Sequence, residues 1–505
     1  MLYVSIFVEL LRSNPALAVL SAALMQAALW VLVPALFYGA PPGELPVVIA
    51  VGHQFQLGSY LGPPLASWLA EIAFDIAGKH ALGVYVLSQV CVFVTFWAVF
   101  LLGRSIVGAH HAAMAVLLMV GIFAFTLPTS EFGPAVLAMP LWALILLHYW
   151  RAVGERRELY WYAVAIETGL LVLTTYAGLL LAALLLLFTI ANSRARSALR
   201  SMAPWLAAIG AVVVISPHLF WLFRQENHAL SILPQLQIPR SIAASVGAWF
   251  EQIGLIIAAH AGLAVIVVLV AGLPWSKQEP APFVMRRPVK SFARQFVYFF
   301  ATAPALAATI IAALIGSPRP LGGVATLVVF SGLAVIVAAD DKIELARQRA
   351  IISAWFALLL GPPAITMVAL LGLPWLGIDP GVDQPASTTA RFFADSFQRR
   401  LGAPLQVIAG DPRTAAIVSI YAPSRPALFL DAVPEHSPWV TLDDIRSKGA
   451  ILVWPTSDTS GTPPPDIKAR FPQIVPELPQ GFERPVQGRL PLARVGWALI
   501  RPEAR

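Results

Sequence analysis

The sequence predicts an all-α polytopic membrane protein that ends in a small α/β domain. Hydrophobic residues make up 58% of the 505 residues and charged residues only 12%, about half the charged share of an average soluble domain. The apolar residues fall in long unbroken runs, and a run of about 18 or more predicts a membrane-spanning helix. After about Gly377 the chain becomes rich in charge, Pro and Gly, and no later run is long enough to span.

The first apolar run, Pro15 to Tyr38, is long enough to cross a bilayer. At about 1.5 Å per residue it would cover roughly 36 Å, which allows some tilt. It is too long for the core of a cleaved signal peptide, and a turn over Gly39–Gly43 follows it in place of a cleavage site. We therefore expect the run to remain as the first spanning helix.

Similar runs recur along the chain and predict about eleven spanning helices. Their approximate ranges are 15–38, 81–102, 111–127, 133–149, 160–173, 176–191, 203–223, 242–273, 296–315, 321–338 and 350–375. This count divides the chain into a membrane module, residues 1–376, with a long first outer loop over 39–80, and a domain over 377–505.

The basic residues predict the orientation. With the N-terminus in the cytoplasm, most Lys and Arg fall in inner segments, and the outer loops before the tail hold only Lys79, Arg224, Arg240 and Arg319. Such a bias is typical of inner loops. Eleven crossings then place residues 377–505 outside the cytoplasm. The net charge of +7 is thus explained by topology, and we expect no nucleic-acid partner.

The tail carries the pattern of a small α/β domain. A strand is expected over 404–410, followed by a helix from Asp411 to Tyr421 in which Asp411 is the cap and Pro412 the first helical residue. Further short strands are expected over 427–430, 450–453 and 495–500. Because Cys91 is the single cysteine of the chain, this domain must be stable without an intramolecular disulfide.

The first outer loop carries most of the residues that suggest chemistry. Glu44 is followed by His53 and Tyr60, and then by Pro63-Pro64, which lead into an apolar stretch over Ala66–Ala77. This last stretch predicts a helix that lies along the membrane surface.

Four stretches in order resemble one family, the bacterial GT-C glycosyltransferases related to lipid A aminoarabinose transferases and protein O-mannosyltransferases. The stretches are Gly43-Glu44 with Gly58–Leu69, Thr129–Pro134 with Pro140–Leu144, Gly169–Gly178, and Ser216–Trp221. The resemblance covers roughly residues 10–230. Three positions depart from the family pattern: Gly43 stands for an acidic residue, Gly62 for His, and Thr175 for Lys.

The resemblance implies a GT-C fold and an inverting transfer of a sugar from a polyprenyl-phosphate donor, with or without a divalent metal ion. The acceptor would be an envelope lipid, a glycan or a protein, with lipopolysaccharide modification favoured by analogy. The protein would lie among the lipids of the bacterial inner membrane with residues 377–505 in the periplasm.

Transfer of a sugar from a lipid phosphate needs a base near the acceptor and positive charge near the departing phosphate. The resemblance implies that Glu44 is the base, and Glu131 in the second outer loop is a candidate to join it. Solvent exposure or helix capping would also explain both carboxylates.

Arg224 is the strongest candidate for the phosphate, because the planar guanidinium donates two parallel hydrogen bonds. An interfacial anchor at a helix end would explain it equally well. His218, Tyr60, His53 and Tyr176 complete the predicted donor-binding set, with His228 near Arg224. Arg240, Arg319 and Lys79 are weaker candidates.

Two acidic residues, Glu167 and Glu251, fall within predicted spans. Such residues are functional candidates by default, but we favour a structural role for both.

Two other functions stay open. A lipid or solute transporter or flippase would explain the many helices, but it would leave the long outer loop and the folded tail unexplained. A non-catalytic scaffold with the GT-C fold would explain the three departures from the family pattern.

Overall fold

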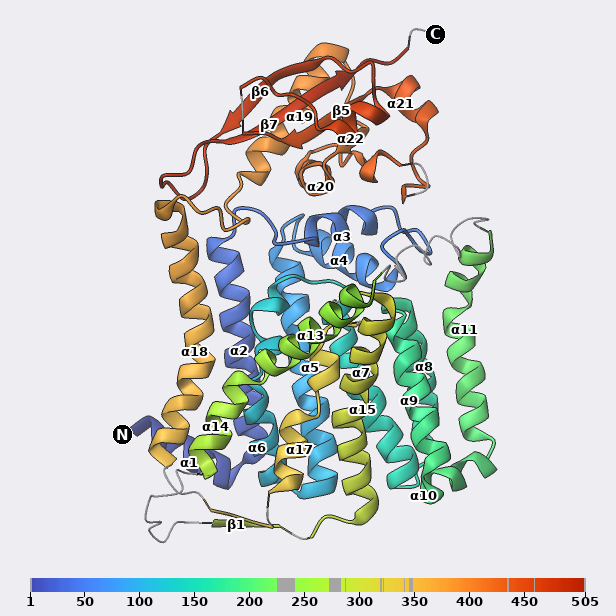
Figure 1. Ribbon diagram of the computed structural model, residues 1–505, viewed down its shortest axis with the longest axis vertical. Helices are drawn as coiled ribbons and strands as arrows, with labels where there is room; N and C mark the ends of the chain where they lie inside the picture. Colours follow the sequence, from blue (N-terminus) through green and yellow to red (C-terminus); the bar gives the residue numbers. More distant parts are fainter. Residues whose placement is uncertain are drawn as a thin grey trace. The chain divides into compact units, whose positions relative to one another are not determined.

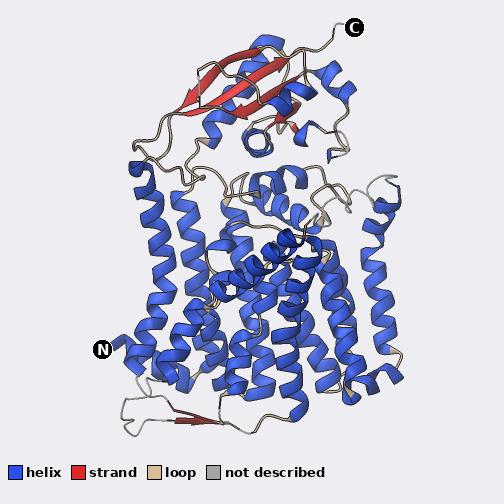
Figure 2. Ribbon diagram, in the orientation of Figure 1, coloured by secondary structure: helices blue, strands red, loops and turns tan. Residues whose placement is uncertain are grey.

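The computed structural model (Figures 1 and 2) describes residues 2–224, 241–271, 283–286, 288–317, 320, 322–339, 341–344, 348–433, 436–457 and 459–503. The chain divides into two compact units. A helical unit comprises Met1–Val31 and Ser88–Ala364, and a mixed unit comprises Leu32–Leu87 and Ile365–Arg505. The mixed unit therefore joins the first loop to the C-terminal segment of the chain.

Seven helices among the described residues are long and apolar enough to cross a membrane. They are α2 (Pro15–Phe37), α5 (Leu82–Val107), α7 (Pro134–Tyr149, continued to Gly154), α11 (Ala203–Arg224), α13 (Ile242–Ala259), α15 (Ser291–Ile315) and α18 (Gln348–Gly372, continued to Leu376). The predicted polytopic helical fold is confirmed.

Two bent helix pairs would raise the number of spans in the described residues to 9. They are α6 (Ala109–Met119) with Phe123–Ser130, bent by 85°, and α9 (Ala177–Ala191) with Ser193–Arg200, bent by 98°. Shorter helices complete the unit: α1 (Leu2–Ser13), α8 (Tyr160–Thr174), α10 (Ser193–Arg196), α14 (Ala261–Ala271), α16 (Val324–Val328) and α17 (Ser331–Ala338). The unit also contains a short antiparallel pair of strands, β1 (Phe283–Met285) and β2 (Lys342–Glu344). The count of eleven crossings stays a prediction.

The helical unit is held together by close backbone approach and by aromatic packing. At Gly169 of α8, a Cβ atom would come within 2.5 Å of Val214 on α11, which is the close contact that small residues permit between membrane helices. Tyr149 of α7 stacks on Phe296 of α15 with ring centroids 6.1 Å apart, and Phe296 lies 5.0 Å from Phe300. Such ring pairs stabilise the interior beyond the area that they bury.

In the mixed unit, the first loop folds into two packed helices, α3 (Leu45–Gly52) and α4 (Leu65–Ile76). The helix expected over Ala66–Ala77 is confirmed as α4. A Cβ at Gly52 would lie 2.0 Å from the carbonyl oxygen of Ser67, so only glycine allows this approach. All eight residues of α3 are buried. The sequence did not predict α3, because a short apolar run has no amphipathic period.

The C-terminal segment contains a five-stranded sheet with the strand order β4-β3-β5-β7-β6, drawn red in Figure 2. Its strands are β3 (Val407–Gly410), β4 (Ala427–Phe429), β5 (Ala450–Pro455), β6 (Pro476–Phe482) and β7 (Ala493–Ile500). Strand β3 pairs in parallel with β4 and β5, whereas β7 is antiparallel to β5 and β6. Four helices accompany the sheet: α19 (Ala386–Leu401), α20 (Pro412–Tyr421), α21 (Leu442–Lys448) and α22 (Pro465–Arg470).

The predicted α/β pattern of this segment is confirmed in detail at α20, where the Asp411 side chain accepts from the Thr414 amide at 2.9 Å. The predicted strands correspond to β3, β4, β5 and β7. Strand β6 was missed, since Pro476, Pro479 and Gly481 argue against a strand. Trp454, Leu452 and Phe429 are fully buried in the core of this segment, so side-chain packing replaces the missing disulfide.

Candidate functional site

Glu44 lies directly before α3, with an exposed side chain. Its backbone carbonyl accepts from Val47 at 2.9 Å and begins the helix. The neighbouring backbone is fixed by Arg413 of α20, whose guanidinium donates to the carbonyl oxygens of Gly43 at 2.7 Å and Pro41 at 3.1 Å. A third bond, to the carbonyl oxygen of Gly381 at 2.6 Å, ties the same guanidinium to the segment before α19. The backbone next to Glu44 is therefore anchored to α20 and to the segment before α19.

His53, at the end of α3, belongs to a buried charge cluster. Its Nδ1 lies 2.7 Å from Oε1 of Glu71 on α4. Nη2 of Arg425, in the turn between α20 and β4, donates to both oxygens of Glu71 at 2.8 and 2.7 Å. The Glu71 side chain is 0% exposed and that of Arg425 6%, whereas His53 is 37% exposed. The cluster thus presents the histidine outward and buries the ion pair.

The cluster fixes the tautomer of His53. Burial by itself would raise the pKa of Glu71, but the hydrogen bonds from His53 and Arg425 outweigh it and hold the pKa of Glu71 below its ordinary value. Glu71 is therefore ionised and only accepts hydrogen bonds. It follows that Nδ1 of His53 carries a proton, and that Nε2 is the nitrogen left for a ligand.

Tyr60 joins a second histidine of the mixed unit. Its ring stacks on the imidazole of His436 with centroids 3.6 Å apart and an angle of 19° between the planes. Nδ1 of His436 pairs with Oδ2 of Asp431 at 2.9 Å. The contact joins the loop between α3 and α4 to the segment after β4.

Two predicted residues of the helical unit meet directly. Tyr176, at the start of α9, hydrogen-bonds through its hydroxyl to Nε2 of His218 on α11 at 3.0 Å. His218 is 1% exposed and stacks on Trp221 with ring centroids 5.7 Å apart. This contact brings together two of the four stretches that carry the family resemblance.

Arg224 is the last residue of α11, and it is exposed. Its guanidinium lies over the ring of Phe220 at 4.5 Å, a contact that suits an interfacial anchor as well as a phosphate ligand. Arg240, Arg319 and His228 lie outside the described residues. Lys79 is exposed beyond the end of α4.

Glu131 follows the short helix Leu127–Ser130 of the helical unit and is exposed. Glu167 pairs with Nδ1 of His148 at 2.7 Å, and its structural role stays a prediction. Glu251 is exposed on α13. In the described ranges, no three His, Cys, Asp or Glu side chains are grouped so as to hold a metal ion.

Sequence reasoning missed three residues of this region, namely Glu71, Arg413 and Arg425. Glu71 lies 18 positions after His53, and Arg425 lies 354 positions after Glu71. No periodic pattern spans such separations. The weak signal for Glu71 was a carboxylate in a largely apolar helix, α4, which also contains Asp75.

Part of the chain matches a known sequence family. Residues 62–221 match the sequence profile of the dolichyl-phosphate-mannose-protein mannosyltransferase family. This range contains three of the four stretches on which the resemblance rests. No curated protein sequence matches the chain.

The fold comparison extends over nearly the whole chain. ArnT from Cupriavidus metallidurans, in a crystal structure bound to undecaprenyl phosphate, is similar with a TM-score of 0.60 at 12% identity, over 96% of this chain and 99% of that one. The apo structure of the same protein gives 0.59 at 13% identity, over 97% and 99%. The chain thus has the fold of the GT-C membrane glycosyltransferases, as the resemblance predicted.

Proposed function

We propose that this protein is a membrane glycosyltransferase that moves a sugar from a polyprenyl-phosphate donor to an envelope acceptor. The observation that carries the proposal is the set of contacts by which the C-terminal segment holds the first loop. Arg413 of the C-terminal segment bonds the backbone just before Glu44. His53 bonds to Glu71, which pairs with Arg425 of the same segment. The full-length likeness to a protein that binds undecaprenyl phosphate supports the choice of donor.

The proposed reaction is a single displacement at the anomeric carbon. The hydroxyl or amine of the acceptor forms a bond to this carbon as the bond to the phosphate oxygen breaks, and the configuration inverts. Glu44 takes the proton of the acceptor. Polyprenyl phosphate leaves with the bonding electrons and an added negative charge.

Positive groups stabilise the departing phosphate in this proposal. His53 would meet the donor through Nε2, since Nδ1 is committed to Glu71. Arg224 stays the arginine predicted to bind the phosphate. Tyr60, His218 and Tyr176 stay predicted donor-binding residues. A charge-assisted hydrogen bond that forms only as charge develops lowers the barrier to transfer.

The first test compares envelope lipids and glycans of a deletion strain after complementation. Wild-type protein should restore a sugar-sized mass that Glu44→Gln does not restore, with a loss of activity of roughly 10²- to 10⁴-fold. Asp75→Asn, which removes an exposed carboxylate of α4, is the matched control and should restore the mass. Full restoration by Glu44→Gln would remove Glu44 as the base. No change on deletion would favour the scaffold or the transporter.

We also propose that the protein lies in the bacterial inner membrane with the N-terminus in the cytoplasm and residues 377–505 in the periplasm. The positive-inside distribution supports this orientation. A reporter that works only after export should be active when it is fused after Arg505, and one that works only in the cytoplasm should be silent there. The reverse pattern would contradict the orientation.

A further inference from the structure

The sheet of the C-terminal segment contains a topological switch point. Strands β3, β4 and β5 follow one another along the chain but stand in the order β4-β3-β5, all parallel. The connection after β3 thus leads to β4 on one side of β3. The connection after β4 crosses back over β3 and leads to β5 on its other side. In open α/β sheets, ligands bind outside the carboxyl ends of the strands at such a point.

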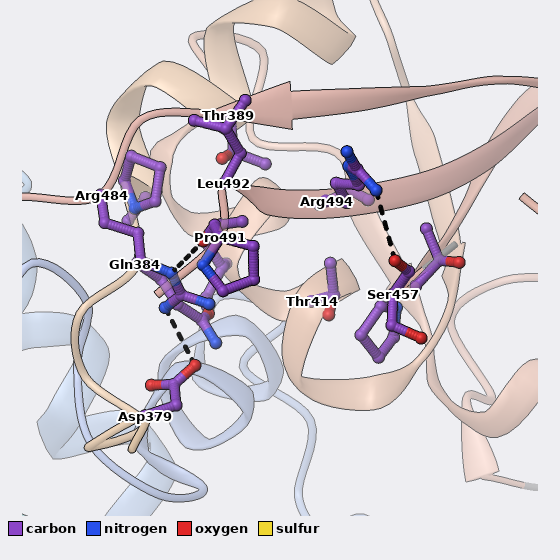
Figure 3. A pocket seen from close by; sticks show the side chains of 16 residues that line it. Asp379, Gln384, Thr389, Thr414, Ser457, Arg484, Pro491, Leu492 and Arg494 are labelled. Carbon is purple, nitrogen blue, oxygen red and sulfur yellow. Dashed lines mark hydrogen bonds and ion pairs between the residues drawn. The ribbon is translucent and has the colours of Figure 1, made fainter. Parts of the chain in front are cut away.

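A pocket of about 230 Å³ lies at this place. Thr414, in the first turn of the helix after β3, and Thr456 and Ser457, just past the end of β5, form part of its wall. Figure 3 shows Thr414 between two polar groups, with Arg484 and Asp379 on one side and Arg494 with Ser457 on the other. The pocket is smaller than the roughly 300–1,000 Å³ of sites for drug-sized ligands, so it suits one small unit.

The two arginines have different roles. Arg484 is 13% exposed and is committed to the fold, since its Nη1 donates to Asp379 Oδ2 at 2.9 Å and to the Asp383 carbonyl at 3.0 Å. Its Nε donates to the Pro491 carbonyl at 3.0 Å. Arg494 makes a longer bond, 3.3 Å from Nη1 to the Ser457 carbonyl. Within the described lining, Asp379 and Arg484 balance each other, so Arg494 gives the pocket a net positive charge.

The remaining lining suits a sugar better than a bare phosphate. Thr389, Gln384 and Ser457 offer hydroxyl and amide groups, and Pro385, Pro455 and Leu492 offer apolar walls. The start of α20, where a phosphate would bind, already faces the Asp411 carboxylate, which accepts from the Thr414 amide at 2.9 Å and the Thr414 hydroxyl at 2.7 Å. A multiply charged phosphate would be repelled there.

We propose that this pocket binds a single sugar unit that carries one negative charge, with Arg494 pairing to its acidic group. The hydroxyl and amide groups of the lining bond to the ring hydroxyls, and the apolar walls cover the C–H face. The assignment concerns binding only and does not require the proposed transfer reaction.

The test uses the full-length protein in detergent micelles and measures binding of glucuronate, glucose and inorganic phosphate by calorimetry or ligand-observed NMR. Glucuronate should bind more tightly than glucose and phosphate. Arg494→Gln should weaken glucuronate binding by about tenfold or more, while Arg494→Lys retains part of the affinity. Arg470→Gln, which changes an exposed arginine of α22, is the matched control and should bind as the wild type does.

A second variant distinguishes a blocked pocket from a misfolded protein. Leu492 is 49% exposed, so Leu492→Trp should fill the pocket without disturbing the core, and it should abolish glucuronate binding at an unchanged melting temperature. Equal binding of glucose and glucuronate, phosphate as tight as glucuronate, no glucuronate binding, or an unaffected Arg494→Gln would each overturn the proposal. Because no donor is present, such a failure leaves the proposed transferase activity untouched.

Discussion

Glu44 and Glu71 are two carboxylates of the same loop with opposite surroundings. Glu71 is 0% exposed and held by Arg425 and His53, whereas Glu44 is exposed beside a backbone that Arg413 fixes. A buried carboxylate must be paired, because an unpaired charge in the interior is costly. An exposed one can exchange protons with a substrate. Burial thus separates the carboxylate that holds the loop from the one that we propose as the base.

The largest expected effect follows from removing the partner of Glu71. Arg425→Met leaves the buried Glu71 carboxylate without its arginine and with His53 alone, and it should lower the free energy of unfolding by about 3–5 kcal/mol. The melting temperature of the purified protein checks this. Glu71→Leu combined with Arg425→Met should recover part of the loss, since the double change leaves no lone charge. A melting temperature of Arg425→Met equal to that of an exposed control, Arg399→Met, would contradict the comparison.

Removing the anchor of Glu44 should have a smaller effect on stability but a clear one on activity. Arg413→Met deletes the bonds to the carbonyl oxygens of Gly43, Pro41 and Gly381, worth about 1.5–3 kcal/mol for a charged donor. The backbone that positions Glu44 would lose these bonds, so the turnover number of the proposed reaction should fall by about tenfold or more. Wild-type turnover in this variant would show that the anchor does not position Glu44.

The smallest effect concerns pH. Because the pKa of Glu71 is lower in the folded protein than its ordinary value of 4.5, the unfolded chain binds more protons near that pH. The stability from the cluster is therefore complete above about pH 4.5 and is lost as the pH falls through the folded pKa. Melting curves of Glu71→Gln should depend less on pH in this range than those of the wild type. Equal slopes would contradict the lowered pKa.

Local patterns in the sequence predicted the elements whose formation depends on residues close together in the chain. Apolar runs predicted the membrane helices, and Asp411 with Pro412 predicted the start of α20, because capping depends on neighbouring residues. The buried helix α3 and the proline-containing strand β6 were missed, since tertiary packing decides both.

The site was predictable only in part. The family resemblance pointed to Tyr176 and His218, and the structure joins them by a hydrogen bond. It also pointed to His53 but not to Glu71 or Arg425, which complete its cluster. Ion pairs between residues hundreds of positions apart produce no periodic pattern or fixed spacing in a single sequence. Such pairs are therefore seen only in the folded structure.

The most direct test of the proposed activity is reconstitution. Total lipid from the deletion strain should contain both the unused polyprenyl-linked donor and the unmodified acceptor, and purified protein is added to liposomes of this lipid. Mass spectrometry should show the donor mass falling and a sugar-sized mass appearing on one acceptor with wild type and Asp75→Asn, but not with Glu44→Gln. An unchanged lipid profile with correctly folded wild-type protein would contradict the account. Equal conversion by Glu44→Gln would contradict it as well.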